Sequence, residues 1–189
     1  MYRASERRVL LELARHAIEF GLRAGEMPEV PPDRYASVLR QKRSSFVTLK
    51  CDRRLRGCIG QLEAQEPLVQ SVVRNAYAAA FSDPRFPPLC AVELPGVTIS
   101  LSVLSEQEPL SFDSEQQLLQ QLTPGRDGLV LQDRGKRGTF LPAVWENLPD
   151  PRDFLRELKN KAGLEPDHWS ATLTVTRYAT DTFAESDDD

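Results

Sequence analysis

A cysteine between two glycines stands out at residues 55–60, which read Leu-Arg-Gly-Cys-Ile-Gly. The surrounding residues are typical of a β-strand, yet Gly57 and Gly60 would weaken a strand unless another group must approach its backbone closely. A thiol reacts in proportion to its thiolate fraction, and fixed positive charge nearby favours the thiolate. Arg56 supplies such a charge beside Cys58. This hexapeptide is therefore the first candidate for chemistry.

The hexapeptide forms the second half of a predicted β-hairpin. The pattern predicts a strand over 45–51, a three-residue turn at 52–54 and a returning strand over 55–62. In the register that this turn sets, one face is apolar and consists of Val47, Leu49, Cys51, Leu55 and Ile59. The other face carries Phe46, Thr48, Lys50, Arg56, Cys58 and Gly60. We therefore expect Arg56 and Cys58 to point together away from the core.

The residues of the polar face indicate a site for a small anionic substrate or intermediate. Cys58 would be the reactive or ligand-contacting group, with Arg56 and Lys50 as anion anchors. Gly57 and Gly60 would give a ligand close access to the backbone. The alternative is that Cys58 is a small side chain packed beneath a loop.

A loop rich in proline follows the hairpin and a predicted buried helix over 67–80. Residues 82–88 read Ser-Asp-Pro-Arg-Phe-Pro-Pro, and their three prolines make the loop stiff. We expect Asp83 and Arg85 to brace this loop and to contact the substrate. The alternative is a structural salt bridge between them.

Composition limits the classes of function. The chain has 189 residues, 40% of them hydrophobic and 28% charged, which is typical of a globular protein with its own core. No apolar run approaches the about 18 residues of a membrane helix. The three cysteines and two histidines show no spacing that would hold zinc or an iron–sulfur cluster, and the sequence implies no metal or cofactor. The odd cysteine count favours a reducing compartment, so we expect a cytoplasmic protein.

Charge is unevenly distributed along the chain. The net charge of -4 argues against a general nucleic-acid-binding protein. Basic residues nevertheless gather over 40–56, where a solvated rim and a platform for a small anion or RNA both remain open. The last residues, 186–189, predict a disordered acidic tail.

The order of elements predicts an α+β fold, a mixed, mainly antiparallel sheet flanked by helices, in a single domain over 1–185. Helices are predicted at 10–21, 33–40, 67–80, 114–122 and 150–163. Further strands are predicted at 97–103, in a hairpin over 129–141 and at 171–175. The strand at 97–103 alternates apolar residues with small hydroxyl side chains, which either face solvent or line a polar groove.

The hexapeptide and its context resemble the AMMECR family, whose bacterial and archaeal members are called AmmeMemoRadiSam system protein A. Further matching stretches lie at 45–49, 82–88, 125–129, 138–142 and 154–164, with Trp169. The resemblance implies a larger and a smaller lobe with a cleft near the hexapeptide. It also implies association with a Memo-like protein, related to non-haem iron dioxygenases, and with a radical SAM protein. Many members carry a cysteine where this chain has Lys159, so a mechanism that requires that second thiol does not transfer.

Two hypotheses of different class follow. The first is a cytoplasmic component of that system, handling a small anionic substrate near Cys58. The second is a non-catalytic adaptor that docks partner proteins, or less readily RNA, through the basic hairpin face. The resemblance implies no particular reaction, so the sequence leaves open whether the protein is an enzyme.

Overall fold

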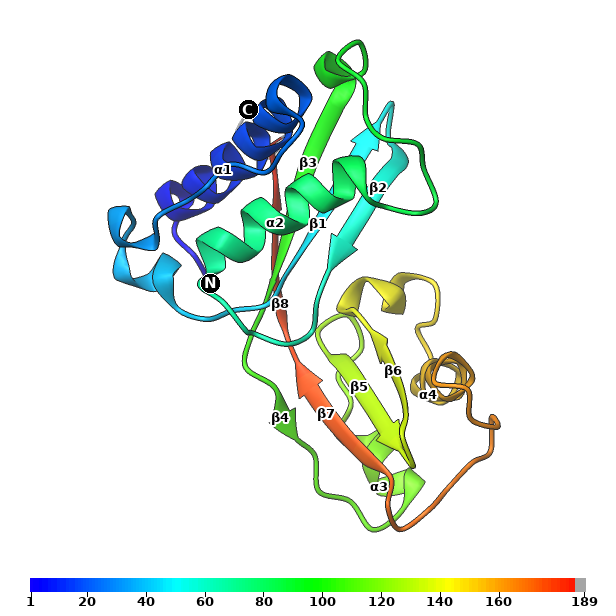
Figure 1. Cartoon of the computed structure of the whole chain (residues 1–189). Helices are drawn as coiled ribbons and strands as arrows, with labels where there is room; N and C mark the ends of the chain where they lie inside the picture. The colour runs from blue at the N-terminus through cyan, green and yellow to red at the C-terminus, as the bar shows by residue number, and fades with distance from the viewer. Residues whose placement is uncertain (186–189) are drawn as a thin grey trace. The chain divides into compact units, whose positions relative to one another are not determined.

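The computed structural model describes residues 1–185 and divides the chain into two compact units (Figure 1). Unit 1 combines Met1–Leu104 with the C-terminal stretch from Asp181, and unit 2 is Ser105–Thr180. Helices and antiparallel strands occur in both, which confirms the α+β prediction. The predicted acidic tail at 186–189 lies outside the described residues.

Unit 1 is organised around a four-stranded sheet with strand order β2-β1-β3-β8. Its helices are α1 Ala4–Ala24 and α2 Leu68–Phe81, and its 3₁₀ helices are η1 Pro32–Arg34, η2 Ser37–Arg40 and η3 Leu94–Gly96. Its strands are β1 Ser45–Cys51, β2 Arg54–Gly60, β3 Val97–Leu104 and β8 Thr180–Ala184, which begins at the last residue of unit 2. The pairs β1–β2 and β1–β3 are antiparallel.

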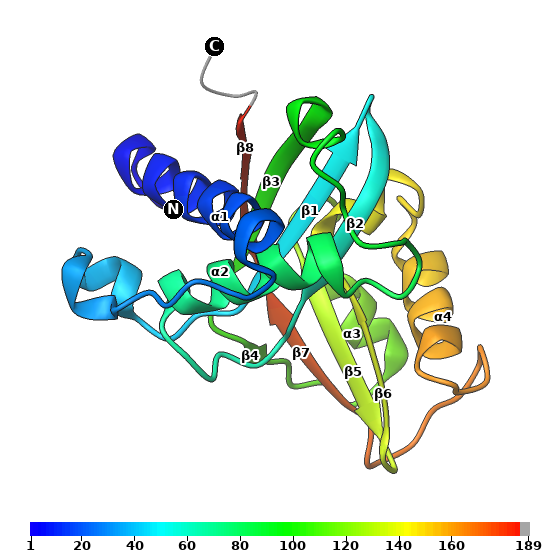
Figure 2. The ribbon, with the colours of Figure 1, turned by 45° about the horizontal axis from the view of Figure 1, so that its top comes forward.

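Both helices of unit 1 pack on the same face of this sheet (Figures 1 and 2). Helix α1 buries an apolar stripe that includes Leu10, Ala14 and Ile18, and it ends where Gly25 adopts a left-handed conformation, with φ of 75°. The strands present alternate apolar residues to the helices, and Val47, Leu49, Ile99 and Leu101 are fully buried. The residues between them therefore lie on the face that the helices leave open.

The helix predicted at 33–40 is instead two short 3₁₀ turns, η1 and η2. Tyr35, at the end of η1, has φ of -113° and ψ of 160°, which is extended backbone. Ala36 is extended as well, so the chain leaves the helical conformation before η2 begins. The segment is too short to form α-helical hydrogen bonds across this break.

Unit 2 contains a second four-stranded sheet, with order β4-β7-β5-β6 and antiparallel pairs throughout. Its elements are β4 Glu108–Pro109, α3 Glu115–Gln121, β5 Gly128–Asp133, β6 Lys136–Phe140, η4 Pro142–Glu146, α4 Pro151–Lys161 and β7 Thr174–Tyr178. Two sheets rather than one form because the chain leaves the first sheet after β3 and rejoins it only with β8. The strands in between pair among themselves.

Candidate functional site

The β1–β2 hairpin closes with a two-residue turn, shorter by one residue than predicted. Asp52 and Arg53 have φ of 50° and 64°, and Cys51 pairs with Arg54. Two consecutive left-handed residues give the turn whose twist matches antiparallel strands. The prediction that Cys51 lies opposite Leu55 was therefore wrong.

A β-bulge restores the predicted register further along the hairpin. Lys50 pairs with Leu55 and Leu49 pairs with Gly57, so Arg56 is an extra residue in β2. Beyond the bulge, Leu49 opposite Gly57 is as predicted. Leu55 was predicted to face the core, but it lies opposite Lys50 and is 43% exposed.

Arg56 binds the loop that follows α2. Its Nε donates to Oε1 of Glu93 at 2.7 Å, and its Nη2 donates to Oε2 of Glu93 at 3.0 Å and to the carbonyl oxygen of Pro87 at 3.0 Å. The hydrogen bonds from Arg56 and from the backbone of Cys90 lower the pKa of Glu93 to about 2. The carboxylate of Glu93 therefore balances the charge of Arg56 within the protein, and the role of Arg56 as anion anchor and catalytic residue beside Cys58 stays a prediction.

Both glycines of the hexapeptide make room for the protein itself. A Cβ at Gly57 would lie 2.1 Å from the carbonyl oxygen of Ala79 on α2. A Cβ at Gly60 would lie 2.3 Å from the ring of Phe46, which covers this glycine across the strand pair. Helix packing and an aromatic ring thus account for both, and the predicted clearance for a ligand is filled.

Cys58 lies on the open face of the sheet, opposite Thr48, as the hairpin pattern predicted. Its Sγ is 3.2 Å from the hydroxyl oxygen of Thr48, which in turn pairs with Ser100 on β3. The next row on the same face joins Lys50 to Thr98. A half-buried thiol thus begins a row of small hydroxyl side chains, with an exposed lysine in the neighbouring row.

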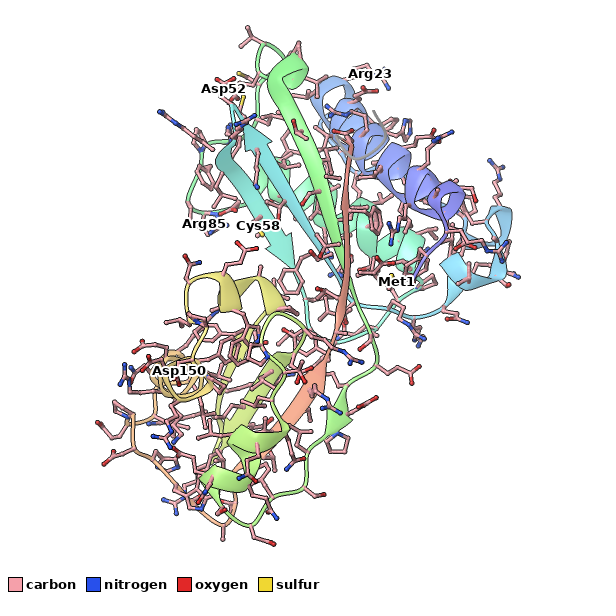
Figure 3. All side chains as sticks on the ribbon, turned by 180° about the vertical axis from the view of Figure 1, so that it is seen from behind. Met1, Arg23, Asp52, Cys58, Arg85 and Asp150 are labelled. Carbon is pink, nitrogen blue, oxygen red and sulfur yellow. The ribbon has the colours of Figure 1, made fainter. Side chains whose placement is uncertain are left out.

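Asp83 and Arg85 together bind the free edge of β2 at Cys58. Figure 3 shows Arg85 beside Cys58. The backbone N–H of Cys58 donates to Oδ2 of Asp83 at 2.8 Å, and the carbonyl of Cys58 accepts from Nη2 of Arg85 at 3.1 Å. The Arg85 side chain also donates to both Asp83 oxygens, at 2.9 and 2.7 Å. The ion pair occupies the position that an added strand would take, and so protects the sheet edge.

The cation next to Cys58 is therefore Arg85. Hydrogen bonds to Asp83 raise the pKa of Arg85, and electrostatic interaction with Cys58 raises it further. The same ion pair, with the backbone N–H of Cys58, holds the pKa of Asp83 well below its usual range. The Asp83 side chain is 2% exposed and that of Arg85 53%, so the carboxylate is fixed while the guanidinium reaches solvent.

Sequence reasoning missed Glu93, which lies 37 residues from Arg56 and shares no local pattern with it. It also missed that Lys159 is a buried residue of unit 2. The Lys159 side chain is 1% exposed, and its Nζ donates to Glu115 at 2.5 Å. The ion pair with Glu115 therefore accounts for a buried lysine at this position.

A second polar cluster in unit 2 surrounds Asp133. Its carboxylate accepts from Nε2 of His168 at 2.6 Å and from the hydroxyls of Ser170 and Thr172 at 2.9 and 2.5 Å. These bonds, led by that from Thr172, lower the pKa of Asp133 to about 2. The cluster fastens the segment before β7 to the end of β5. Within residues 1–185, no group of three or more His, Cys, Asp or Glu side chains could hold a metal ion.

Comparison with known proteins finds relatives that match most of the length of this chain. A protein of Thermofilum pendens is 38% identical over 97% of this chain and 91% of its own, and one of Methanothermobacter thermautotrophicus is 40% identical over 86% and 84%. The crystal structure of the uncharacterised protein PH0010 from Pyrococcus horikoshii has a TM-score of 0.84 and 35% identity, covering 94% of this chain and 90% of that one. In the described part of the chain, no helix is both long and apolar enough to cross a membrane. The model of the AMMECR1 family matches residues 11–183, and the chain belongs to this family.

Proposed function

We propose that unit 1 binds a small anionic group on the open face of its sheet, beside Cys58. Arg85 and Lys50 supply the positive charge, and the thiol of Cys58 is the reactive or ligand-contacting group. Asp83 positions Arg85, while Arg56 holds the loop in place. The proposed site keeps Cys58, Lys50 and Arg85 of the sequence prediction and leaves out Arg56.

The observation that carries this proposal is how Arg85 is held. Nε and Nη2 of Arg85 donate hydrogen bonds to the carboxylate of Asp83, and Nη2 also donates to the carbonyl oxygen of Cys58. Among residues 1–185, Nη1 has no hydrogen-bonding partner and the side chain is 53% exposed. An arginine fixed along one edge presents its remaining N–H groups in a constant direction, which suits recognition of an anion.

Lys50 and the hydroxyl row extend the same surface. Lys50 and Thr48 are two residues apart on one strand, so their side chains leave the same face about 7 Å apart. Thr48 and Ser100 can donate hydrogen bonds to anionic oxygens. A small anion lying over Cys58 would meet a hydroxyl on β1 and the guanidinium at the sheet edge.

Competing alkylating reagents test the proposal. Iodoacetate is anionic and iodoacetamide is neutral, and peptide mapping by mass spectrometry assigns each modified thiol. We expect the ratio of the iodoacetate to the iodoacetamide rate constant to be at least about threefold higher at Cys58 than at exposed Cys90, whose thiol faces Glu93. Arg85→Gln should lower the ratio to that of Cys90, and Lys50→Gln should lower it in part.

Arg53→Gln is the matched control, because Arg53 is an exposed arginine in the hairpin turn. It should leave the ratio at Cys58 unchanged. Equal ratios at Cys58 and Cys90 in the native chain would overturn anion binding. A Cys58 that neither reagent modifies, with wild-type behaviour of Cys58→Ala in the intact system, would remove the role of the thiol.

Family membership supports the wider proposal that the chain is a cytoplasmic component acting with a Memo-like protein and a radical SAM protein. A second function, an adaptor without catalysis, is favoured by the hairpin tip. There Leu55 is 43% exposed beside the basic residues Arg53 and Arg54. Charge reversal at Arg54 should then abolish pull-down of either partner, while Cys58→Ser should not. Pull-down by neither partner would remove both the association and the adaptor function.

A further inference from the structure

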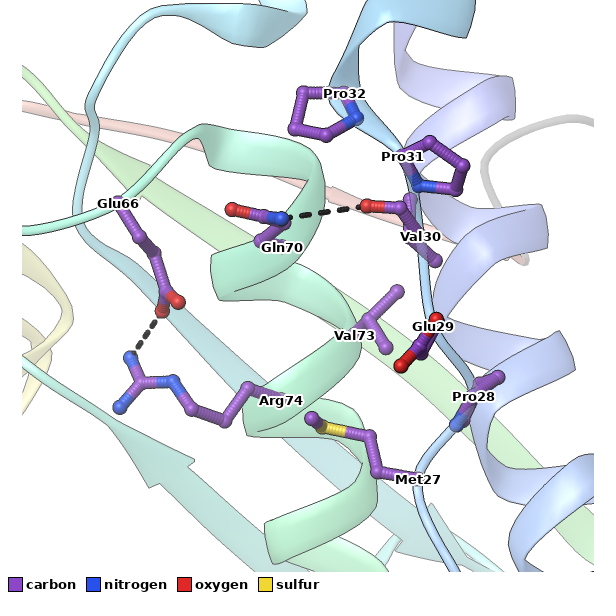
Figure 4. A pocket seen from close by; sticks show the side chains of 10 residues that line it. All are labelled: Met27, Pro28, Glu29, Val30, Pro31, Pro32, Glu66, Gln70, Val73 and Arg74. Carbon is purple, nitrogen blue, oxygen red and sulfur yellow. Dashed lines mark hydrogen bonds and ion pairs between the residues drawn. The ribbon is translucent and has the colours of Figure 1, made fainter.

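Polar groups that lack partners in the wall of a cavity indicate the chemistry of its ligand. In unit 1, a cavity of about 440 Å³ lies between α2 and the segment 27–32 (Figure 4). Glu66 and Arg74 in its wall pair with each other at 2.6 Å, so their charges are already balanced. A smaller cavity in unit 2 differs in this respect.

This second cavity has a volume of about 130 Å³ and is lined by the loop between α3 and β5 and by residues of β4 and β7. At about 30 Å³ for a water molecule, it holds roughly four waters or a ligand of similar size. Its wall carries charges of both signs, from Glu108, Arg126, Asp127 and Arg177. The ligand that fits must therefore be small and polar.

Asp127 is fixed by the loop that it ends. Its Oδ2 accepts from the backbone N–H of Thr123 at 2.8 Å, and its own backbone N–H donates to the carbonyl oxygen of Thr123 at 3.1 Å. The carbonyl oxygen of Asp127 accepts from Nε1 of Trp145 at 2.6 Å. The carboxylate is therefore in place before any ligand binds.

The loop does not use the second oxygen of this carboxylate. The Asp127 side chain is 4% exposed, and its Oδ1 has no hydrogen-bonding partner among residues 1–185. Oδ1 is not one of the unpartnered atoms that are shielded from solvent, so it is open to the cavity. Nη1 of Arg177 lies 3.9 Å from Oδ2, which is too far for a hydrogen bond. A buried carboxylate oxygen thus remains free to accept from a ligand.

Arg177 offers the complementary donor. Its Nη2 donates to Oε2 of Glu108 at 3.1 Å, while its Nη1 makes no hydrogen bond within the described part of the chain. The Arg177 side chain is 34% exposed, so Nη1 is within reach of a ligand. Arg126, which is exposed and precedes Asp127 in the loop, adds a second guanidinium to the wall.

A simple ion does not suit both halves of this cavity. A cation would bind Asp127 but meet two arginines, and an anion would bind the arginines but meet Asp127 and Glu108. A zwitterion places an opposite charge against each half. Because Asp127 and Arg177 lie 3.9 Å apart, the two charges of the ligand must also be close. An α-amino acid meets this condition, since a single carbon separates its ammonium and carboxylate groups.

We propose that this cavity binds a free α-amino acid with a small side chain or none. The ammonium group donates to Oδ1 of Asp127, and the carboxylate accepts from Nη1 of Arg177 and from the guanidinium of Arg126. The site lies within unit 2 and is independent of the proposed function of Cys58.

Indole NMR of the full chain tests the site with glycine as the probe. The chain has two tryptophans, and the indole N–H of Trp145 donates to the backbone of Asp127. Labelling the indole nitrogens with ¹⁵N gives two signals, which Trp169→Phe assigns, and glycine should shift that of Trp145 saturably. Acetate lacks the ammonium group and methylammonium lacks the carboxylate, so at constant ionic strength both should bind at least about tenfold more weakly.

Two substitutions test the contacts in the same titration. Asp127→Asn keeps one oxygen for the Thr123 N–H but removes the charge, and Arg177→Gln removes the guanidinium. Each should weaken glycine binding by at least about tenfold. Arg152→Gln, at an exposed arginine of α4 outside the cavity, is the matched control and should leave binding unchanged.

Arg126→Gln, at an exposed residue, should weaken glycine binding by about threefold. If Asp127→Asn or Arg177→Gln fails to fold, this variant and the three probes on the native chain carry the test. Absence of a saturable Trp145 shift, equal binding of the three probes, or full affinity in the cavity variants would each overturn the proposal.

Discussion

Replacing Asp83 with asparagine is expected to destabilise unit 1 by about 2–3 kcal/mol at neutral pH. The carboxylate accepts four hydrogen bonds, from the backbone N–H groups of Cys58 and Arg85 and from Nε and Nη2 of Arg85. An asparagine side chain of the same size has one accepting oxygen. Its NH₂ group would face one of these donors.

The magnitude follows from the exposure of the two partners. Removing one member of a buried ion pair costs about 3–5 kcal/mol, because the other charge remains buried. Here the Arg85 side chain is 53% exposed, so water can solvate the guanidinium after the substitution. The remaining cost is the loss of a hydrogen bond from the buried backbone N–H of Cys58 and of one from the guanidinium of Arg85. Each loss costs about 1 kcal/mol or slightly more.

The effect of Asp83 should depend on pH in one direction. The hydrogen bonds from Arg85, and then those from the backbone, hold the pKa of folded Asp83 below its usual value. Its stabilisation is therefore complete well above the unfolded pKa of about 3.9 and is lost as pH falls through the lower folded value. The stability difference between the native chain and Asp83→Asn should be constant near neutral pH and should shrink below about pH 4.

Urea unfolding followed by circular dichroism, at pH 7 and across the acid range, measures this difference. Asp52→Asn is the matched control, because Asp52 is exposed in the hairpin turn with φ of 50°, where asparagine is well accommodated. It should change stability by less than about 0.5 kcal/mol. If Asp83→Asn unfolds at the same urea concentration as this control, the ion pair does not secure the edge of β2.

Three further substitutions have defined outcomes. Gly57→Ala should destabilise the chain by about 2–3 kcal/mol in urea unfolding, since its Cβ would lie 2.1 Å from the backbone oxygen of Ala79. Glu93→Gln should weaken the ion pair with Arg56 and lower the free energy of unfolding by about 1–2 kcal/mol. It should also speed alkylation of Cys90, whose thiol contacts Glu93. Lys159→Met should leave urea stability unchanged or raise it by about 1 kcal/mol, because an apolar side chain of similar length replaces a buried charge whose partner is 43% exposed.

Each of these has a control or a contrary result. Gly96→Ala should cost less than Gly57→Ala, because its nearest neighbour is the Cys51 sulfur at 3.2 Å rather than a backbone oxygen. Unchanged alkylation of Cys90 in Glu93→Gln would show that Glu93 does not shield that thiol. A loss of more than about 3 kcal/mol in Lys159→Met would mean that the Lys159 ion pair is needed for the fold of unit 2.

The sequence predicted elements whose signals are local. The helices α1 and α4 and the strands of the β1–β2 hairpin were predicted because residue patterns within each short segment indicate them. Cys58 was placed opposite Thr48 correctly because the turn is one residue shorter than predicted and the bulge adds one residue to β2, so the two differences cancel. The prediction of a three-residue turn was wrong because a two-residue turn followed by a bulge gives the same alternation of buried and open-face residues from Gly57 onward. The sequence pattern therefore does not distinguish the two arrangements.

The choice of arginine could not be predicted, because it depends on contacts between distant segments. Arg56 lies in the predicted strand of the hexapeptide and Arg85 in the proline-rich loop. The neighbouring residues in the sequence do not indicate which of the two is paired with a carboxylate and which reaches solvent. Glu93 neutralises Arg56, whereas Asp83 fixes Arg85 and leaves it half exposed. The tertiary structure therefore decides which arginine lies beside Cys58 with its guanidinium partly exposed.

The two arginines connect β2 and the loop in opposite directions. Arg56 reaches from β2 to the loop, Arg85 reaches from the loop to the backbone of Cys58, and their guanidinium carbons lie 5.8 and 5.6 Å from the ring centre of Phe86 between them. Packing thus accounts for Arg56 and for both glycines of the hexapeptide. It does not account for a thiol at position 58, whose sulfur contacts the Thr48 hydroxyl that a serine could also reach. Cys58→Ser should therefore fold as the native chain does, and any loss of function in that variant would be a loss of sulfur chemistry.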